Sequence, residues 1–200
     1  EMRMTKTQQR IRTGTLTMAL WAFMAGMPLQ AAGASGNGFE AKTALQGVPL
    51  QLNGSGTRYK AIFRLYDMAL YTPARGNTAE TILSMAGPKR LSFVALRDLP
   101  GTDLGVAFIK GLTSNSPADL VQKHTASSTR LIEIFSGKSK LAAGDTFAME
   151  FVPGRGTTFF IQGQAQGAPI GDAEFFSMVL KIWIGPVPAD FKLKDALLGL

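Results

Sequence analysis

A group of basic and hydroxyl side chains follows a glycine pair in the segment GSGTRYKAIFRLYDMALY, at 54–71. Period-two alternation places Arg58, Lys60, Arg64 and Tyr66 on one face of a strand that begins at Arg58. An arginine presents paired N–H donors that suit a carboxylate, and an apolar surface beyond it suits the rest of an amphipathic molecule. This face therefore favours a cleft that takes an anionic head at Arg58 and an apolar body beyond Tyr66. The alternative is that the three cations form a solvated edge of the sheet.

The glycines and the strand define what must position Arg58. Gly54 and Gly56 are expected to let the chain turn sharply and bring Arg58 close to a cavity or a partner strand. The strand is then expected to continue without interruption to Tyr71. Its face opposite Arg58 is expected to be mostly core, and it comprises Tyr59, Ala61, Phe63, Leu65, Asp67, Ala69 and Tyr71.

The N-terminus has the pattern of a secretory signal peptide. Four basic residues lie between Arg3 and Arg12, an apolar run follows over 16–29, and small residues end the pattern at 31–34. The apolar run is shorter than the roughly 20 residues of a membrane-spanning helix, which favours cleavage over retention as an anchor. The sequence therefore predicts a signal peptide at 1–34, contact with the membrane only through this cleavable segment, and a periplasmic or secreted protein of residues 35–200.

Charge and composition exclude several classes of function. Removing residues 1–34 takes away four basic residues and one acid, so the formal net charge falls from +7 to +4. The remaining basic residues form no run, and no aromatic platform accompanies them, so nucleic-acid binding is set aside. The chain has no cysteine. This excludes disulfides, thiolate metal sites and cysteine nucleophiles.

The remaining segments indicate an α+β fold in a single domain. Strands are predicted at 39–45, 48–52, 91–96, 145–152 and 157–161, and helices at 77–85, 102–112, 116–135, 173–184 and 191–198. Strands grouped early and late, with helices between and after them, predict one curved antiparallel sheet covered by helices on one face.

The only histidine, His124, lies on the apolar side of the helix predicted at 116–135. A lone histidine without an Asp, Glu or Cys cluster at ligand spacing is more often a hydrogen-bonded core residue than a metal or haem ligand. No GxSxG elbow accompanies it, so a serine triad is excluded. No metal site and no cofactor are predicted.

The chain resembles the chalcone isomerase superfamily, and more closely its bacterial isomerase-like branch. The resemblance covers residues 38–200 and rests on the order of several motifs. They are GxGxR at 54–58 with the following Tyr66 and Ala69-Leu70-Tyr71, then Gly87-Pro88-Lys89-Arg90-Leu91, VPGRGT at 152–157, and the run from Val179 to Gly199. The resemblance implies an open-faced β-sandwich, in agreement with the predicted curved sheet.

True chalcone isomerases use an arginine, two threonines, a tyrosine and an asparagine. The resemblance keeps only the arginine, as Arg58, and matches the others to Tyr66, Leu104, Gly111 and Ile182. Losing this polar network argues against catalysis, and no catalytic residue is predicted. Arginine with tyrosine resembles instead the fatty-acid-binding branch, where the pair holds a carboxylate. On one continuous strand the two residues would lie up to about 26 Å apart, so their convergence would require a bulge or bend.

These observations predict an exported, non-catalytic protein that binds a small amphipathic carboxylate such as a fatty acid. The predicted ligand-binding residues are Arg58, Tyr66, Met68, Leu104 and Phe108. An intramolecular lyase of the chalcone isomerase type is the first alternative. Haem binding through His124 and a structural or interaction protein are the others.

Overall fold

The computed structural model describes residues 37–200. The signal peptide predicted at 1–34 lies outside the described residues. Within them, no helix is both long enough and apolar enough to cross a membrane.

The centre of the fold is an antiparallel sheet of seven strands in the order β1-β2-β3-β4-β7-β8-β9. Its strands are β1 (Lys42–Leu45), β2 (Val48–Lys60), β3 (Phe63–Thr72), β4 (Lys89–Ala95), β7 (Thr146–Val152), β8 (Gly156–Ile161) and β9 (Gln164–Ala165). A separate pair, β5 (Leu99–Pro100) and β6 (Lys140–Leu141), which the sequence did not predict, brackets the helical segment between them. Strands β1 to β4 pair in sequence order. Strand β4 then pairs with β7, and the segment between them in the sequence contains β5, three helices and β6.

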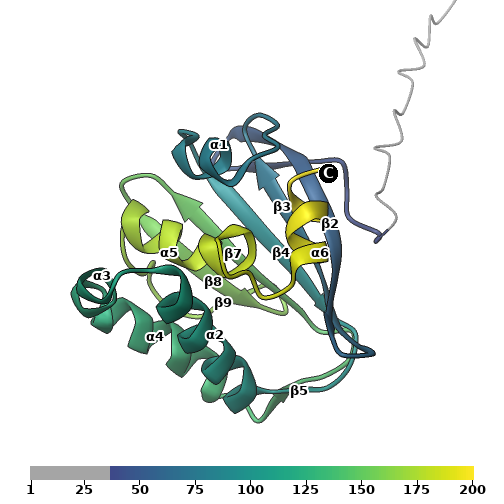
Figure 1. Cartoon of the computed structure of the whole chain (residues 1–200), viewed down its shortest axis with the longest axis vertical. Coiled ribbons are helices and arrows are strands. Elements are labelled where there is room, and N and C mark those ends of the chain that lie inside the picture. Colours follow the sequence, from purple (N-terminus) through teal and green to yellow (C-terminus); the bar gives the residue numbers. More distant parts are fainter. Residues whose placement is uncertain (1–36) are drawn as a thin grey trace, which may run out of the picture. The chain divides into compact units, whose positions relative to one another are not determined.

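Helices cover one face of this sheet (Figure 1). They are α1 (Ala79–Ser84), α2 (Gly101–Asn115), α3 (Ala118–Lys123), α4 (Thr125–Ser136), α5 (Ala173–Ile184) and α6 (Phe191–Leu197). Asp172 caps α5 by accepting from the Phe175 N–H, and Asp190 caps α6 by accepting from the N–H groups of Lys192 and Leu193. The predicted α+β architecture, a curved antiparallel sheet with helices on one face, is confirmed.

The helix predicted at 116–135 is two helices. His124 lies between α3 and α4 with backbone angles of φ −99° and ψ 21°, which are outside the helical region. The amphipathic period continues through this break, so the sequence pattern alone did not reveal it.

The main core lies between the sheet and the helices. On β3, Tyr66, Met68 and Leu70 point into it, and each is less than one-tenth exposed. A smaller apolar cluster lies on the other side of the sheet, where Ala69 and Tyr71 meet residues of β1 and β2. The expectation that the face opposite Arg58 would be mostly core is wrong, because Tyr59, Ala61 and Phe63 on that face are exposed and Asp67 is polar.

The strand predicted to run unbroken from Arg58 to Tyr71 is a β-hairpin. The chain reverses at Ala61 and Ile62, where Ala61 has a φ of 54°, and β2 then pairs with β3 in antiparallel register. Such turns usually carry glycine or asparagine at a positive φ. Because this turn carries neither, alternation across it predicted one strand.

Gly54 and Gly56 also have a different role from the one predicted. Both lie within β2 and neither has a positive φ, so they form no turn. A Cβ built on Gly54 would lie 2.0 Å from the Ala196 carbonyl oxygen, and one on Gly56 would lie 2.8 Å from the Ala196 Cβ. The glycines therefore remove the side chains that would hold α6 away from β2.

Candidate functional site

Arg58 and Tyr66 are directly paired residues on β2 and β3. The hairpin turns the chain between them, and the pairing register also shifts by one residue, at Leu65, between the Arg58–Tyr66 and Tyr59–Arg64 pairs. Directly opposed residues of antiparallel strands have Cβ atoms about 5 Å apart. Two of the five predicted ligand-binding residues are thus brought together at the edge of the main core, Arg58 partly exposed and Tyr66 buried.

The Tyr66 hydroxyl lies at the centre of a small polar network. It accepts a hydrogen bond of 2.8 Å from the indole N–H of Trp183 on α5. Burial raises the pKa of Tyr66, and the Trp183 hydrogen bond and the charge and hydrogen bond of Arg58 act against that rise. The phenol therefore stays protonated at neutral pH. Because Trp183 donates to its oxygen, the hydroxyl's own proton is available to an incoming acceptor.

The Arg58 guanidinium is held loosely by Asp190. The nearest nitrogen and oxygen are 3.8 Å apart, which is longer than a hydrogen bond, and the Arg58 side chain keeps 21% of its exposure. Arg58 also donates to the carbonyl oxygen of Tyr59. Asp190 is satisfied from other sources, since it accepts from the Tyr59 N–H and caps α6. Of the two charged groups beside Tyr66, Arg58 is therefore less fully neutralised by its neighbours than Asp190 is.

Trp183 joins the remaining predicted residues to this network. Its ring lies 6.0 Å from that of Phe108 on α2, edge to face. Met68 and Leu104 belong to the same core cluster, and of the predicted apolar residues Leu104 keeps the largest exposed fraction, 9%. The structure therefore places the predicted apolar residues in one continuous region behind Tyr66, where they are packed against one another.

Sequence reasoning did not identify Trp183 and Asp190 as parts of this site. Trp183 lies in the helix predicted at 173–184, and a buried indole N–H usually has an acceptor. Asp190 immediately precedes α6, which is a typical position for a capping residue. The sequence shows that Trp183 needs an acceptor and that Asp190 can cap a helix. It does not show that Trp183 contacts Tyr66 or that Asp190 lies near Arg58.

Two positions matched to catalytic residues of true chalcone isomerases form a helix contact here. A Cβ built on Gly111 of α2 would lie 2.7 Å from the Ile182 Cγ2 of α5. These are the positions that the resemblance matched to the asparagine and the late threonine. Close apolar packing of α2 on α5 therefore occupies the place where two polar groups would have to face a substrate.

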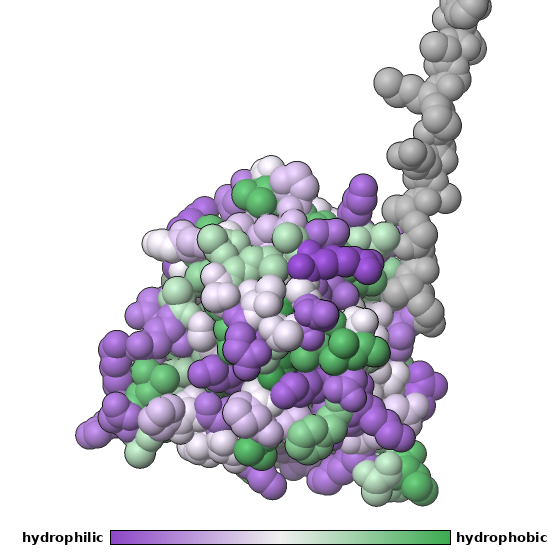
Figure 2. All heavy atoms as spheres, turned by 45° about the horizontal axis from the view of Figure 1, so that its top comes forward, coloured by the Kyte–Doolittle hydropathy of each residue, from purple (hydrophilic) through white to green (hydrophobic). Residues whose placement is uncertain are grey.

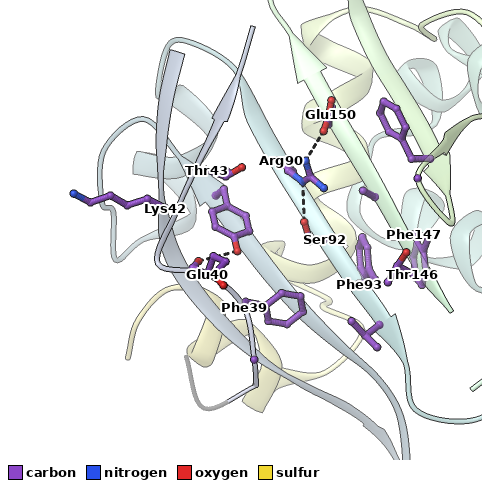
Figure 3. Close-up of a pocket in the computed structure, with 16 residues that line it drawn as sticks. Phe39, Glu40, Lys42, Thr43, Arg90, Ser92, Phe93, Thr146, Phe147 and Glu150 are labelled. Atoms are coloured by element: carbon purple, nitrogen blue, oxygen red, sulfur yellow. Dashed lines mark hydrogen bonds and ion pairs between the residues drawn. The ribbon is translucent and has the colours of Figure 1, made fainter. Parts of the chain in front are cut away.

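A cavity of about 560 Å³ lies on the face of the sheet opposite the helices (Figure 3). At its centre Arg90 of β4 donates to Glu150 of β7 at 2.7 Å and to the Ser92 hydroxyl at 2.9 Å. Phe39 and the start of β1 lie beside it in Figure 3. Its volume falls within the usual range for ligand pockets. The Arg90 charge is already paired, however, so a carboxylate entering this groove would have to displace Glu150.

His124 is a hydrogen-bonded, buried residue, as the more conservative of its two interpretations predicts. Its Nε2 lies 2.8 Å from Glu174 Oε1 and its side chain is 7% exposed. The Lys123 ammonium and then His124 lower the pKa of Glu174. Among the residues that the structure describes, no group of three or more His, Asp or Glu side chains is placed to hold a metal ion. An iron bound at Nε2 would first have to break the contact with Glu174.

Comparison with known proteins gives a consistent result. The fold aligns with the crystal structure of a fatty-acid binding protein of Arabidopsis thaliana at a TM-score of 0.60 and 15% sequence identity, over 83% of this chain and 95% of that chain. At this identity the likeness establishes a shared fold. No curated protein matches the sequence significantly. A family model described as chalcone isomerase-like matches residues 31–199, which is most of the sequence. The chain therefore belongs to the chalcone isomerase-like family.

Proposed function

We propose that this protein binds a small amphipathic carboxylate, of the fatty acid class, without transforming it. The observation that carries the proposal is the cross-strand pair of Arg58 and Tyr66. A guanidinium that is loosely paired and a phenol whose proton is free to donate converge on one point at the edge of the core. This is a donor set for the two oxygens of one carboxylate.

Comparison of the two arginine sites favours Arg58 as the anchor. Arg90 holds Glu150 at hydrogen-bonding distance, whereas Arg58 lies 3.8 Å from Asp190. A ligand carboxylate at Arg58 displaces no strong ion pair, and Asp190 keeps its backbone N–H donors. Binding at Arg90 would separate Glu150 from the cation that it contacts, and Lys42, the other cation lining the groove, points away from Glu150 in Figure 3. The desolvation of that carboxylate would oppose binding there.

The apolar body of the ligand is proposed to enter the core beside Met68, Leu104 and Phe108. These side chains are packed in the structure, so binding must move them. Methionine adapts most readily because its side chain is unbranched and flexible. The chain from Gly185 to Asp190, which joins α5 to α6, borders this route, and Asn115 holds it through two hydrogen bonds to Val187. Displacement of this connection would open the core behind Tyr66.

The absence of catalysis is part of the proposal. Supporting it, Gly111 and Ile182 pack against each other and Leu104 is apolar, so three of the matched positions carry no polar group. Residues that act together in catalysis lose most of their effect when the set is broken. We expect chalcone cyclisation with the purified protein to equal the uncatalysed rate. A rate that Arg58→Ala abolishes would support the lyase alternative instead.

Export is also proposed, on the strength of the N-terminal sequence pattern. Expressed in a Gram-negative host, the protein is expected in the periplasm with a new N-terminus between about Ala32 and Ser35. N-terminal sequencing of the periplasmic fraction tests this. A chain that keeps Arg3 to Arg12 and sediments with membranes would contradict it.

The binding proposal is tested with fatty acids and their methyl esters. The sequence has two tryptophans, Trp21 in the predicted signal peptide and Trp183 in the site, so the processed protein reports through Trp183 alone. A fatty acid is expected to change Trp183 fluorescence saturably, while its methyl ester, which lacks the charge, binds much more weakly. Equal binding of acid and ester would contradict carboxylate recognition. Mass spectrometry of the molecule that co-purifies with the protein would then identify the ligand.

A further inference from the structure

The tip of the β2–β3 hairpin exposes several apolar side chains to solvent. Ile62 is 85% exposed, Phe63 52% and Tyr59 43%. All the residues from 59 to 64 are exposed, and the turn projects from the rest of the sheet (Figure 1). In Figure 2 an apolar group marks this corner of the molecule, with hydrophilic residues beside it. We call residues 59–64 the hairpin tip.

Cations surround the hairpin tip. Lys60 and Arg64 lie within it, and the Arg97 guanidinium lies 4.7 Å from the centre of the Phe63 ring. The acids nearby are already partnered. Asp67 is buried and accepts from Thr57 and Asn37, with Arg64 3.9 Å away. Asp98 pairs with Lys140, and Asp190 pairs with Arg58 and caps α6. Counted together, the five cations Arg58, Lys60, Arg64, Arg97 and Lys140 outnumber the three acids Asp67, Asp98 and Asp190, so these residues carry a net charge of +2 (5 − 3).

We propose that the hairpin tip docks on an anionic phospholipid bilayer. Exposed Ile and Phe side chains at the end of a narrow projection can enter the headgroup region without unfolding the sheet behind them. Tyr59 suits the boundary between headgroups and acyl chains, where aromatic side chains with a polar end gather. Lys60, Arg64 and Arg97 match the negative surface of such a membrane.

A lipid surface fits these features better than a protein partner does. The tip is small, and its apolar residues lie at the end of a turn instead of spreading over a flat face of the size that stable protein interfaces bury. The cations Lys60, Arg64 and Arg97 are attracted to any anionic lipid headgroup, and this attraction requires no specific geometry. The inference does not depend on carboxylate binding at Arg58, since it uses only the exposed residues beyond that site.

The absence of cysteine allows the tip to be labelled at one position. In the full chain, Ile62→Cys is labelled with an environment-sensitive fluorophore and mixed with vesicles of phosphatidylglycerol and phosphatidylcholine. Val48→Cys, at the start of β2, is the matched control, because Val48 is also an exposed apolar residue, at the far end of the same strand. A probe at a fixed site reports insertion of that site even if another segment brings the chain to the membrane.

We expect the label at position 62 to shift to the blue with anionic vesicles and the label at position 48 to stay unchanged. Neutralising two cations with Lys60→Gln and Arg64→Gln should raise the lipid concentration for half the shift by more than tenfold, since each cation near an anionic surface contributes about fivefold. Phe63→Ser should weaken the shift without changing its dependence on salt. Vesicles of phosphatidylcholine alone should give a weaker response.

Three results would overturn the proposal. One is an unchanged spectrum at position 62 with anionic vesicles, and another is an equal shift at positions 48 and 62. The third is a shift that depends on protein concentration without lipid, which would show that the tip meets a second copy of the chain. Circular dichroism of each variant confirms that the fold is retained. None of these outcomes bears on fatty acid affinity, so the two proposals fail separately.

Discussion

Arg58 lies directly opposite Tyr66 across the β2–β3 ladder, although the two residues are eight positions apart in the chain. This pairing exists because the chain reverses at Ala61 and Ile62. It places a partly exposed cation next to a buried hydroxyl group that Trp183 holds from the helical layer. The proposed carboxylate site thus depends on both layers of the fold.

The hydrogen bond between Tyr66 and Trp183 should contribute measurably to stability. Tyr66→Phe leaves the buried indole N–H without its acceptor, which is expected to lower the free energy of unfolding by about 1–3 kcal/mol. Urea denaturation measures this change. Tyr71→Phe is the control, because the hydrogen bond that its hydroxyl donates to the Glu40 carbonyl is only partly buried, so a smaller loss is expected. If Trp183→Phe and Tyr66→Phe are fully additive, the two groups do not interact.

The same residue predicts a loss of stability in alkaline solution. Burial raises the pKa of Tyr66 above its value of 10.0 in the unfolded chain. As the pH rises through 10.0, the unfolded state loses the phenol proton while the folded state keeps it, so the free energy of unfolding falls. Tyr66→Phe should reduce this decline. An identical decline in the variant and the original protein would show that Tyr66 is not responsible.

Lys89 should affect stability in the opposite direction. Its side chain is 4% exposed, and its ammonium group donates to the Met85 carbonyl, with no carboxylate partner among residues 37–200. Burial lowers the pKa of Lys89 below 10.5, so at intermediate pH the unfolded state binds a proton that the folded state has released. Stability then rises with pH within that window. Relative to Lys89→Met, the original protein should become more stable as the pH rises toward 10.5, which urea denaturation at several pH values measures. A constant difference between the two proteins would contradict this.

Gly54 should tolerate substitution less than Gly56 does. A Cβ on Gly54 would lie 2.0 Å from a backbone oxygen of α6, whereas one on Gly56 meets side-chain atoms at 2.8 Å and 3.2 Å. Side chains move more easily than backbone, so Gly54→Ala is expected to cost about 2–3 kcal/mol and Gly56→Ala about 1–2 kcal/mol. Thermal denaturation compares the two variants. The reverse order would show that α6 does not pack on β2 as described.

The two members of the Arg58 and Asp190 pair should differ in their importance for folding. Asp190→Ala removes the cap of α6 and the acceptor for the Tyr59 N–H, which is expected to cost about 1–2 kcal/mol. Arg58→Ala leaves Asp190 with those backbone donors, and we expect a change within about 1 kcal/mol or a small gain. Chemical denaturation of both variants checks this. A larger loss for Arg58→Ala would identify Arg58 as a structural residue.

The sequence predicted the elements whose signals are local. The helix predicted at 173–184 has the bounds of α5, because the residues that cap and end it, Asp172 and Gly185, lie next to it in the sequence. The hairpin at Ala61 and Ile62 was missed because neither residue type signals a turn. Gly54 was misinterpreted because close approach of α6 depends on residues that lie far away in the sequence. Periodicity over neighbouring residues does not predict contacts between residues that are far apart in the sequence.

The same limit applies to the candidate site. Arg58 and Tyr66 could be selected by residue type and by family resemblance, but their direct pairing follows from a turn that the pattern does not show. Trp183 and Asp190 join the site from α5 and from the cap of α6. Only packing of the helical layer on the sheet brings these residues to the hairpin. The helical layer itself was expected, because the order of strands and helices predicts it and the family resemblance implies the same fold.

The most direct test is the affinity for a medium-chain fatty acid in four proteins: the original protein, Arg58→Lys, Arg58→Ala and Arg90→Lys. The guanidinium of Arg58 can make two parallel bonds to one carboxylate, which a lysine ammonium cannot reproduce. We expect Arg58→Lys to weaken binding, Arg58→Ala to weaken it further, by roughly 2–5 kcal/mol, and Arg90→Lys to leave it unchanged. Unchanged affinity in both Arg58 variants, or a loss confined to Arg90→Lys, would contradict a carboxylate site at Arg58 and Tyr66.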